Sequence, residues 1–195
     1  MLSIRQFTYH AYSIYANFRR IIRGLRYDSW EIADYFRKKG AQIGEGCRID
    51  VISLGGIPSL VSLGNHVFIS QGVIFHTHDG GVWVLREENP DIDLFGKIVI
   101  EDNCVIGANS QLLPNIRIGK NSVIGAGSVV ISDIPPNSIA MGVPARVIGS
   151  TIKYKERSLA IWNEQKPSGN LPKDPLKREM AIRKHIEQYF KNKVD

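Results

Sequence analysis

Two histidines, two residues apart, are the side chains of this chain best placed for chemistry. His76 and His78 occur in the segment FHTHDGG (75–81), where Asp79 and two glycines follow them. Residues i and i+2 of an extended strand lie on one face, so both imidazoles should point the same way. An imidazole can act as a general base near neutral pH, and three imidazoles together can bind zinc. This segment is therefore the first candidate for a functional site.

A six-residue repeat must position these histidines. Six consecutive hexapeptides between residues 100 and 135 each open with an aliphatic residue, namely Ile100, Ile106, Leu112, Ile118, Ile124 and Val130. One hexapeptide forms a short strand and a corner, and three of them close a triangular coil. Openers 18 residues apart should therefore stack in columns, Ile100 with Ile118 and Ile106 with Ile124. The period predicts a mainly β protein whose strands form a parallel coil.

The repeat is interrupted twice before this regular part. It begins at Ile43, loses register around Gly55–Leu60, and breaks again after Phe75, which leaves a loop at about 81–98. Asp79 stands where the repeat requires a small residue. A local rule that is broken beside a histidine is typical of a functional site.

Helical segments flank the coil and give three predicted regions. Residues 1–40 hold a heptad stripe over 1–27 and a second helix that ends near Lys39. Residues 41–150 form the coil, with its loop at about 81–98. Residues 151–195 form a helical tail with helices near 152–164 and 176–191.

The net charge of +6 is unevenly distributed. The coil region 41–150 holds 6 Lys/Arg against 10 Asp/Glu, so the excess of basic residues lies in the helical ends. With no nucleic-acid-binding motif beside them, these residues predict solvated helix faces and no nucleic-acid partner. Weak association with an anionic membrane surface is the alternative.

The apolar and cysteine content favours a cytoplasmic protein. No apolar run approaches the roughly 20 residues of a membrane span, and the N-terminus lacks the pattern of a secretory signal. Cys47 and Cys104 both occupy small positions of the repeat. We expect buried free thiols at these positions, and neither cysteine as a nucleophile.

The segment IGANSQLLPNIRIGKNSVIGAGSVVISDIPPNSIAMGVPARVI (106–148) resembles the C-terminal signature of the hexapeptide-repeat acyltransferases. Their relatives include maltose, serine, xenobiotic and polysaccharide acetyltransferases. The resemblance covers roughly 41–150. It implies a left-handed parallel β-helix, a homotrimer with active sites between subunits, and acetyl-CoA as co-substrate.

The same resemblance gives His78 a role. Many relatives carry a THDG-like segment, which Thr77-His78-Asp79-Gly80 matches, and this implies that His78 is the general base of direct acetyl transfer. His76 is the alternative base, and a pair of solvated strand residues is the structural alternative. Asp79 either orients the imidazole or closes a tight turn with Gly80 and Gly81.

The later coils resemble the donor side of these enzymes. Ala108 and Ala126 are 18 residues apart and should stack beside an extended pantetheine, together with Gly107, Gly125 and Gly127. Arg146 is the candidate for the CoA phosphates, followed by Lys120 and Lys153. The alternatives are ordinary corner geometry for the small residues and a surface ion pair for Arg146.

The long loop is expected to contact the acceptor. Trp83 offers a stacking surface for a sugar, and Arg86, Asp93 and His76 offer polar contacts, with Glu87 and Asp91 as further polar side chains. Alternatively, Trp83 and Phe95 only hold the loop in place by packing.

The sequence as a whole predicts an acetyl-CoA-dependent O-acetyltransferase that acts on a sugar or polysaccharide precursor. A non-glycan acceptor such as serine, an antibiotic or an amino sugar is the nearest alternative. A γ-type carbonic anhydrase and a non-catalytic scaffold are more distant ones. The first would require three histidines to meet at one zinc ion. We expect no metal, because no histidine occurs between residues 79 and 184.

Overall fold

The computed structural model describes residues 31–166 and 169–194. The chain divides into two compact units, one ending at Thr151 and one starting at Ile152. The first unit is the coil with one helix at its N-terminal end, and the second consists of two helices. The heptad stripe expected over 1–27 lies outside the described residues.

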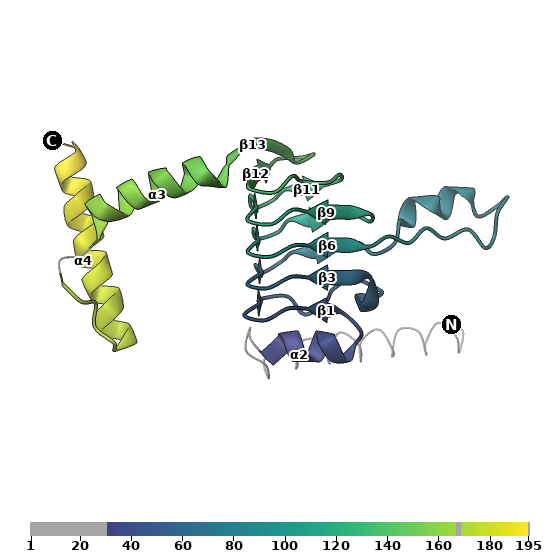
Figure 1. Ribbon diagram of the computed structural model, residues 1–195, viewed down its shortest axis with the longest axis horizontal. Coiled ribbons are helices and arrows are strands. Elements are labelled where there is room, and N and C mark those ends of the chain that lie inside the picture. Colours follow the sequence, from purple (N-terminus) through teal and green to yellow (C-terminus); the bar gives the residue numbers. More distant parts are fainter. Residues whose placement is uncertain (1–30, 167–168, 195) are drawn as a thin grey trace, which may run out of the picture. The chain divides into compact units, whose positions relative to one another are not determined.

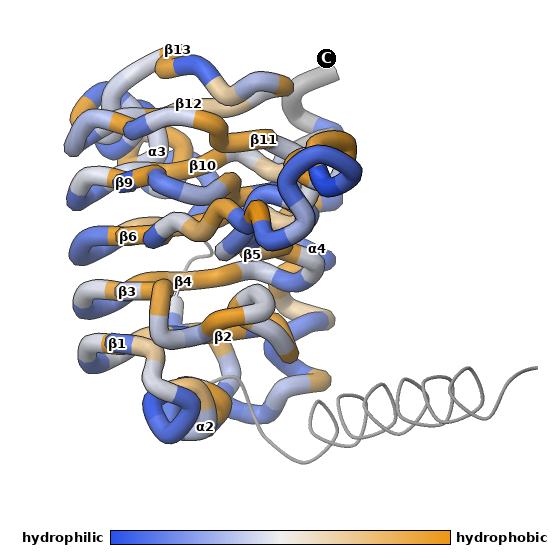
Figure 2. The backbone as a smooth tube through the Cα atoms, turned by 90° about the vertical axis from the view of Figure 1, so that its right-hand side faces the viewer, coloured by the Kyte–Doolittle hydropathy of each residue, from blue (hydrophilic) through white to orange (hydrophobic). Residues whose placement is uncertain are grey.

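Three sheets, parallel except for the last strand of sheet 2, form the three sides of the coil (Figures 1 and 2). Sheet 1 contains β1 (Gln42–Ile43), β3 (Val61–Leu63), β6 (Ile98–Ile100) and β9 (Ile116–Ile118). Sheet 2 contains β2 (Arg48–Ile49), β4 (Phe68–Ile69), β7 (Val105–Ile106), β10 (Val123–Ile124), β12 (Ser138–Met141) and β13 (Arg146–Ser150). Sheet 3 contains β5 (Ile74–Phe75), β8 (Gln111–Leu112) and β11 (Val129–Val130). The predicted parallel coil is confirmed.

The strand register confirms the predicted columns. Ile100 pairs with Ile118, and Ile106 pairs with Ile124, each one turn of the coil above the other. These side chains are almost fully buried, at 0 to 1% exposure. Each buried Ile contributes about 1.5–3 kcal/mol relative to an exposed one, so the ladders form the core.

Asparagines make the corners between sheets 1 and 2. Asn103, Asn121 and Asn137 have left-handed backbone angles, with φ from 56° to 59°, which Asn tolerates better than most residues. Their side-chain amides are hydrogen-bonded to one another along the coil axis. His66 occupies the same corner with φ of 55°, and its Nδ1 lies 2.8 Å from Asn103 Oδ1.

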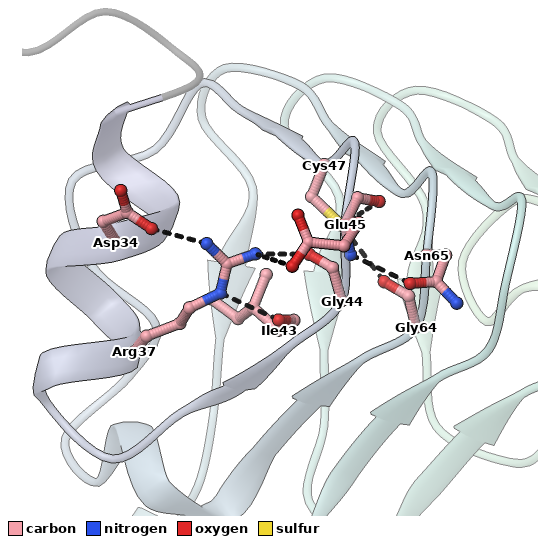
Figure 3. A network of polar contacts seen from close by, with 8 residues as sticks. All are labelled: Asp34, Arg37, Ile43, Gly44, Glu45, Cys47, Gly64 and Asn65. Carbon is pink, nitrogen blue, oxygen red and sulfur yellow. Dashed lines mark hydrogen bonds and ion pairs between the residues drawn. The ribbon is translucent and has the colours of Figure 1, made fainter.

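Helix α2 (Glu31–Lys38) covers the N-terminal end of the coil. It buries Ile32, Ala33 and Phe36 against the first turn. The guanidinium of Arg37 donates to the carbonyl oxygens of Ile43 and Gly44 (Figure 3). These bonds use carbonyl groups next to β1 that have no further coil to pair with, so the end of the stack is closed.

At the other end β13 turns back and pairs antiparallel with β12, which ends the parallel ladder. The second unit holds α3 (Thr151–Gln165) and α4 (Pro175–Val194), close to the two helices predicted near 152–164 and 176–191. No residue of α3 is buried. Among the described residues, no helix has the length and apolar character of a membrane span.

Candidate functional site

Both interruptions of the repeat leave the coil on the same side, where sheet 3 gives way to sheet 1 (Figure 1). The first takes the place of a third strand in the first coil and ends in a short 3₁₀ helix, Pro58–Leu60. The second is a long excursion between β5 and β6. The two breaks in the repeat thus lie at the same edge of the coil, between sheets 3 and 1.

A small antiparallel bridge closes the base of the excursion. His78 pairs with Phe95, Asp79 N–H donates to Leu94 O at 2.8 Å, and Gly96 N–H donates to Thr77 O at 3.1 Å. The excursion therefore covers residues 79–94 rather than the predicted 81–98. Counting in sixes missed this boundary because an antiparallel pair leaves no six-residue signature.

The first break packs directly against the His78 segment. The hydroxyl of Thr77, which is fully buried, accepts a hydrogen bond from Ile57 N–H at 3.1 Å. Gly56 lies against the imidazole, since a Cβ at this position would be 3.7 Å from His78 Nδ1. The repeat pattern located this break in the sequence but did not connect it with the His78 segment. The connection could have been inferred because both breaks directly precede a strand of sheet 1.

The three histidines of the coil differ in their hydrogen-bond partners. His66 is bonded to Asn103, and His76, which is half-buried, has its Nε2 3.1 Å from Gln111 Oε1. His78 is exposed, and its ring has no hydrogen-bond partner among the described residues. His76 and His78 alternate with the buried Phe75 and Thr77, so they share the outer face as predicted. Of the three, His78 is therefore the imidazole whose ring nitrogens are open to a bound molecule.

Asp79 is held by its own loop. Its Oδ1 accepts a hydrogen bond from Gly81 N–H at 2.8 Å and caps the 3₁₀ helix Gly80–Leu85. Of the two roles expected for Asp79, this contact corresponds to the tight turn with Gly80 and Gly81. The carboxylate fixes the direction in which the chain leaves the coil after His78.

Three residues expected to bind the acceptor meet within the excursion. Arg86 forms an ion pair with Asp93 at 3.7 Å, and its guanidinium lies 5.5 Å from the ring centroid of Trp83. Trp83 is nevertheless 72% exposed, while Val82 is buried. Glu87 and Asp91 are exposed or nearly so. Arg86 is thus paired within the excursion, and the cluster presents the exposed indole of Trp83.

The small residues of the later coils stack as predicted, and coil geometry accounts for two of the glycines. A Cβ on Gly107 would be 2.5 Å from Ala126 N, and one on Gly125 would be 2.7 Å from Met141 Cβ. Gly127 N–H donates to Ala108 O at 2.8 Å. Gly107 and Gly125 are thus required by the close approach of successive coils. Ala108 and Ala126 stack at the corner between sheets 2 and 3.

The candidate cations do not gather at one place. Arg146 pairs with Met141 at the end of β12, beside Gly125, so it lies at the same corner as the alanines. Lys120 lies at the corner between sheets 1 and 2, where its backbone N–H donates to Glu101 Oε2. Lys153 belongs to α3 in the second unit. Of these three candidate cations, only Arg146 accompanies the small residues.

The cysteines are packing residues. Both are buried and free, and burial raises the pKa of the Cys47 and Cys104 thiols. A raised pKa keeps a thiol protonated and therefore weakly nucleophilic. Neither cysteine lies at the edge that carries His78.

Metal-binding residues do not converge in the described part of the chain. No group of three or more His, Cys, Asp and Glu side chains there could hold a metal ion. His66 lies at the corner between sheets 1 and 2, whereas His76 and His78 follow β5 of sheet 3. Of the three histidines in the coil, only His78 has a ring without a hydrogen-bond partner among the described residues.

Known proteins share this repeat. The family model of the bacterial transferase hexapeptide (six repeats) matches residues 97–132. Protein CapG of Staphylococcus aureus is 48% identical over 129 residues, which cover 65% of this chain and 75% of CapG. The galactoside O-acetyltransferase of Lactococcus lactis is 42% identical over 92 residues, 45% of this chain and 42% of that enzyme.

A solved structure shows the same fold. The crystal structure of a hexapeptide-repeat-containing acetyltransferase from Vibrio cholerae matches with a TM-score of 0.52 at 23% identity, over 68% of this chain and 86% of that one. The coil is thus a left-handed parallel β-helix. With three quarters of CapG covered at 48% identity and the hexapeptide model matched inside the coil, the chain belongs to the hexapeptide-repeat acyltransferases.

Proposed function

We propose that this protein transfers an acetyl group from acetyl-CoA to a hydroxyl group of a sugar or polysaccharide precursor, with His78 as general base. The observation that carries the proposal is the free, exposed imidazole of His78 at the edge where both breaks of the repeat meet. The galactoside O-acetyltransferase among its relatives supports the reaction class.

The transfer needs one base and no covalent intermediate. A ring nitrogen of His78 accepts the proton of the acceptor hydroxyl as its oxygen attacks the acetyl carbonyl carbon. Backbone N–H groups stabilise the oxyanion that forms. When the carbon–sulfur bond breaks, the imidazolium returns its proton to the leaving thiolate, so the products are an ester and free CoA.

The corner between sheets 2 and 3 fits the donor. Ala108 and Ala126 present only methyl groups there, and a Cβ at Gly127 would meet no atom within 4 Å, so the corner has room for an extended chain. Arg146, exposed at the same corner, is the cation suited to the phosphates. Lys120 is not part of the proposed donor site, because it lies at the opposite edge of sheet 2, at the corner with sheet 1.

The positions of the two half-sites support an assembly in which copies of the chain share each site. Ala108 precedes β8, whereas His78 follows β5, the strand that pairs with β8. Counted along this register they are seven residues apart, at opposite ends of one side of the coil. A neighbouring copy that brings its His78 edge to this corner would complete the site.

The outer face of sheet 2 supports the homotrimer expected from the family. Its outward column begins with the exposed Arg48 and continues with four apolar, half-buried residues, Phe68, Val105, Val123 and Ile139. The matching column of sheet 1 is largely polar, and consists of Gln42, Ser62, Val99 and Arg117. Sheet 2 is therefore the better face for packing against other copies, and the alanine corner is at its edge.

A cytoplasmic location is part of the proposal. Two buried free thiols fit a reducing compartment, where acetyl-CoA is also at hand. The exposed Ile152, Tyr154 and Trp162 of α3, together with neighbouring lysines, support a weak association with a membrane surface.

A screen for acetyl-CoA consumption against sugars, nucleotide sugars, serine and streptogramin-type drugs tests the proposal. Consumption with a carbohydrate hydroxyl in the wild type, and its loss in His78→Ala, is the expected result. Consumption that survives in His78→Ala, or that occurs only with serine or a drug, would overturn the assignment. The molar mass in solution tests the trimer separately.

A further inference from the structure

A hollow of about 520 Å³ opens beside the His78 segment, between residues 50–55 and 72–75. It exists because the first coil lacks its third strand. Sheets 1 and 2 start with β1 and β2 in that coil, whereas sheet 3 starts one coil later, with β5. The first break of the repeat forms the far wall of the hollow instead of a strand.

The missing strand leaves an open ladder edge on β5. Among the described residues β5 pairs with β8 alone, and Val73 and Phe75 line the hollow on the other side. Gly55 lies against the carbonyl oxygen of Phe75, since a Cβ on Gly55 would be 2.8 Å from it, so only the part of the edge before this carbonyl is uncovered. An unpaired strand edge offers N–H and C=O groups that an extended amide can pair with. The hollow therefore offers a short stretch of strand edge to which one amide group can pair.

The other walls select an uncharged group with an apolar end. Ile52 and Ile74 contribute hydrophobic surface. Asp50 is the one charged side chain of the lining, and it is paired with Arg48 at 3.2 Å. Because Asp50 is paired, the lining offers no free cation to a phosphate or carboxylate, whereas Ile52 and Ile74 suit the methyl group of a secondary amide.

The hollow leads to the proposed base. Gly55 lines it, and the next residue, Gly56, lies against the imidazole of His78. Ile74, His76 and His78 alternate with buried residues and share the outer face of this segment. Phe75 is three residues before His78, roughly 10 Å along a strand, and the imidazole lies against Gly56, the neighbour of the lining residue Gly55. A group held at Phe75 and a hydroxyl at His78 can thus belong to one sugar residue.

We propose that the hollow binds the N-acetyl group of the acceptor, so that the substrate is an acetamido sugar that presents a free hydroxyl to His78. This inference rests on the proposed O-acetyltransferase function and names its substrate class. The amide pairs with the open edge of β5, and the methyl group lies against Ile52 and Ile74. Pantetheine is the other source of a secondary amide, so the test must separate the two.

Matched pairs of acceptors give the primary test on the wild-type protein. N-Acetylglucosamine, N-acetylgalactosamine and N-acetylmannosamine are compared with glucose, galactose and mannose in the acetyl-CoA assay. We expect KM to be about tenfold or more lower for at least one acetamido sugar than for its parent hexose, because a parent hexose leaves the strand edge unpaired. Equal KM values within every pair would overturn the inference while leaving the O-acetyltransferase function intact.

A blocking variant and its control locate the effect. Ser53→Trp fills the hollow from a half-buried lining position, and Ser59→Trp puts the same side chain at an exposed position of the same break, outside the lining. Ser53→Trp should raise KM for the acetamido sugar about tenfold and remove its advantage over the parent hexose. Ser59→Trp should not. A rise in KM for acetyl-CoA instead would assign the hollow to pantetheine and overturn the inference.

Ligand-observed NMR gives a readout that does not depend on turnover. In saturation-transfer difference spectra of the His78→Ala protein with N-acetylglucosamine, N-acetylgalactosamine or N-acetylmannosamine, the N-acetyl methyl protons should receive the strongest saturation. Excess pantetheine should not displace them. Absence of methyl saturation for all three sugars would overturn the inference. Absence of acetyl transfer to any carbohydrate, with methyl saturation present, would overturn the proposed function and keep the amide site.

Discussion

The regular coils and the edge that carries His78 are built by different means. In the coils between β6 and β12, the residue type at each position is limited by close contact with the next coil, as Gly107 is by Ala126. At the edge, single contacts hold the chain, such as Ile57 N–H to Thr77 and Gly81 N–H to Asp79. The regular coils thus provide a rigid wall, and the chemistry proposed for this protein lies where the repeat is interrupted.

The largest effect should come from His78→Ala. Removal of a general base lowers turnover by about 10²–10⁴-fold, whereas the coil should remain folded because this side chain is exposed. The rate of acetyl-CoA consumption and the circular dichroism spectrum measure the two outcomes.

His76→Ala is the matched control for this substitution. His76 lies on the same face but is bonded to Gln111, so its removal should cost far less activity. A larger loss in His76→Ala than in His78→Ala would exchange the roles of the two histidines.

The next largest effect should be on stability and should come from the regular coils. Ile124→Ala removes a fully buried side chain from a ladder and should lower the free energy of unfolding by about 2–5 kcal/mol. Trp83→Ala removes a larger but exposed side chain from the excursion and should cost less than about 0.5 kcal/mol. Urea unfolding of both variants compares the two regions directly. Similar losses would mean that the excursion is part of the cooperative core.

The sequence predicted the regular part of the fold almost to the residue. The pairings of Ile100 with Ile118 and of Ile106 with Ile124 followed from the period alone, because every coil repeats the same local rule. The antiparallel bridge of His78 with Phe95 was not predictable in this way. It depends on two segments that meet only after the excursion has folded, and neither carries a periodic signal.

The candidate site was predictable by residue type but not by arrangement. His78 and the cluster of Trp83, Arg86 and Asp93 were identified from their chemistry and neighbourhood. The contact between Gly56 and His78 could not be read from the chain, because the two residues belong to different coils. The sequence likewise did not show that Lys120 and Arg146 lie at different corners of the coil, Lys120 between sheets 1 and 2 and Arg146 between sheets 2 and 3.

Asp79 tests whether the edge depends on single contacts. Asp79→Ala removes the cap of the 3₁₀ helix and should destabilise the excursion by about 0.5–2 kcal/mol, with a few-fold loss of activity. Asp79→Asn keeps an oxygen for Gly81 N–H and should retain most of both. Hydrogen exchange of residues 80–95 and kcat measure these effects. If Asp79→Asn were as inactive as His78→Ala, the charge of Asp79 rather than its cap would be what matters.

The smallest effect should come from Glu101, which links two coils by charge in the regular region. The backbone N–H of Lys120 and the guanidinium of Arg117 hold the pKa of Glu101 below its usual range. The charged carboxylate therefore stabilises the fold above the ordinary Glu pKa, and this contribution is lost as the pH falls through the lowered value. Glu101→Gln should lower the free energy of unfolding at pH 7 by less than about 1 kcal/mol, and the difference should vanish in acid. Glu88→Gln, at an exposed position of the excursion, is the control and should show no such difference. Urea unfolding between pH 3 and pH 7 measures the difference in free energy of unfolding between the wild type and Glu101→Gln. A difference that persisted in acid would mean that Glu101 stabilises the fold through packing and not through its charge.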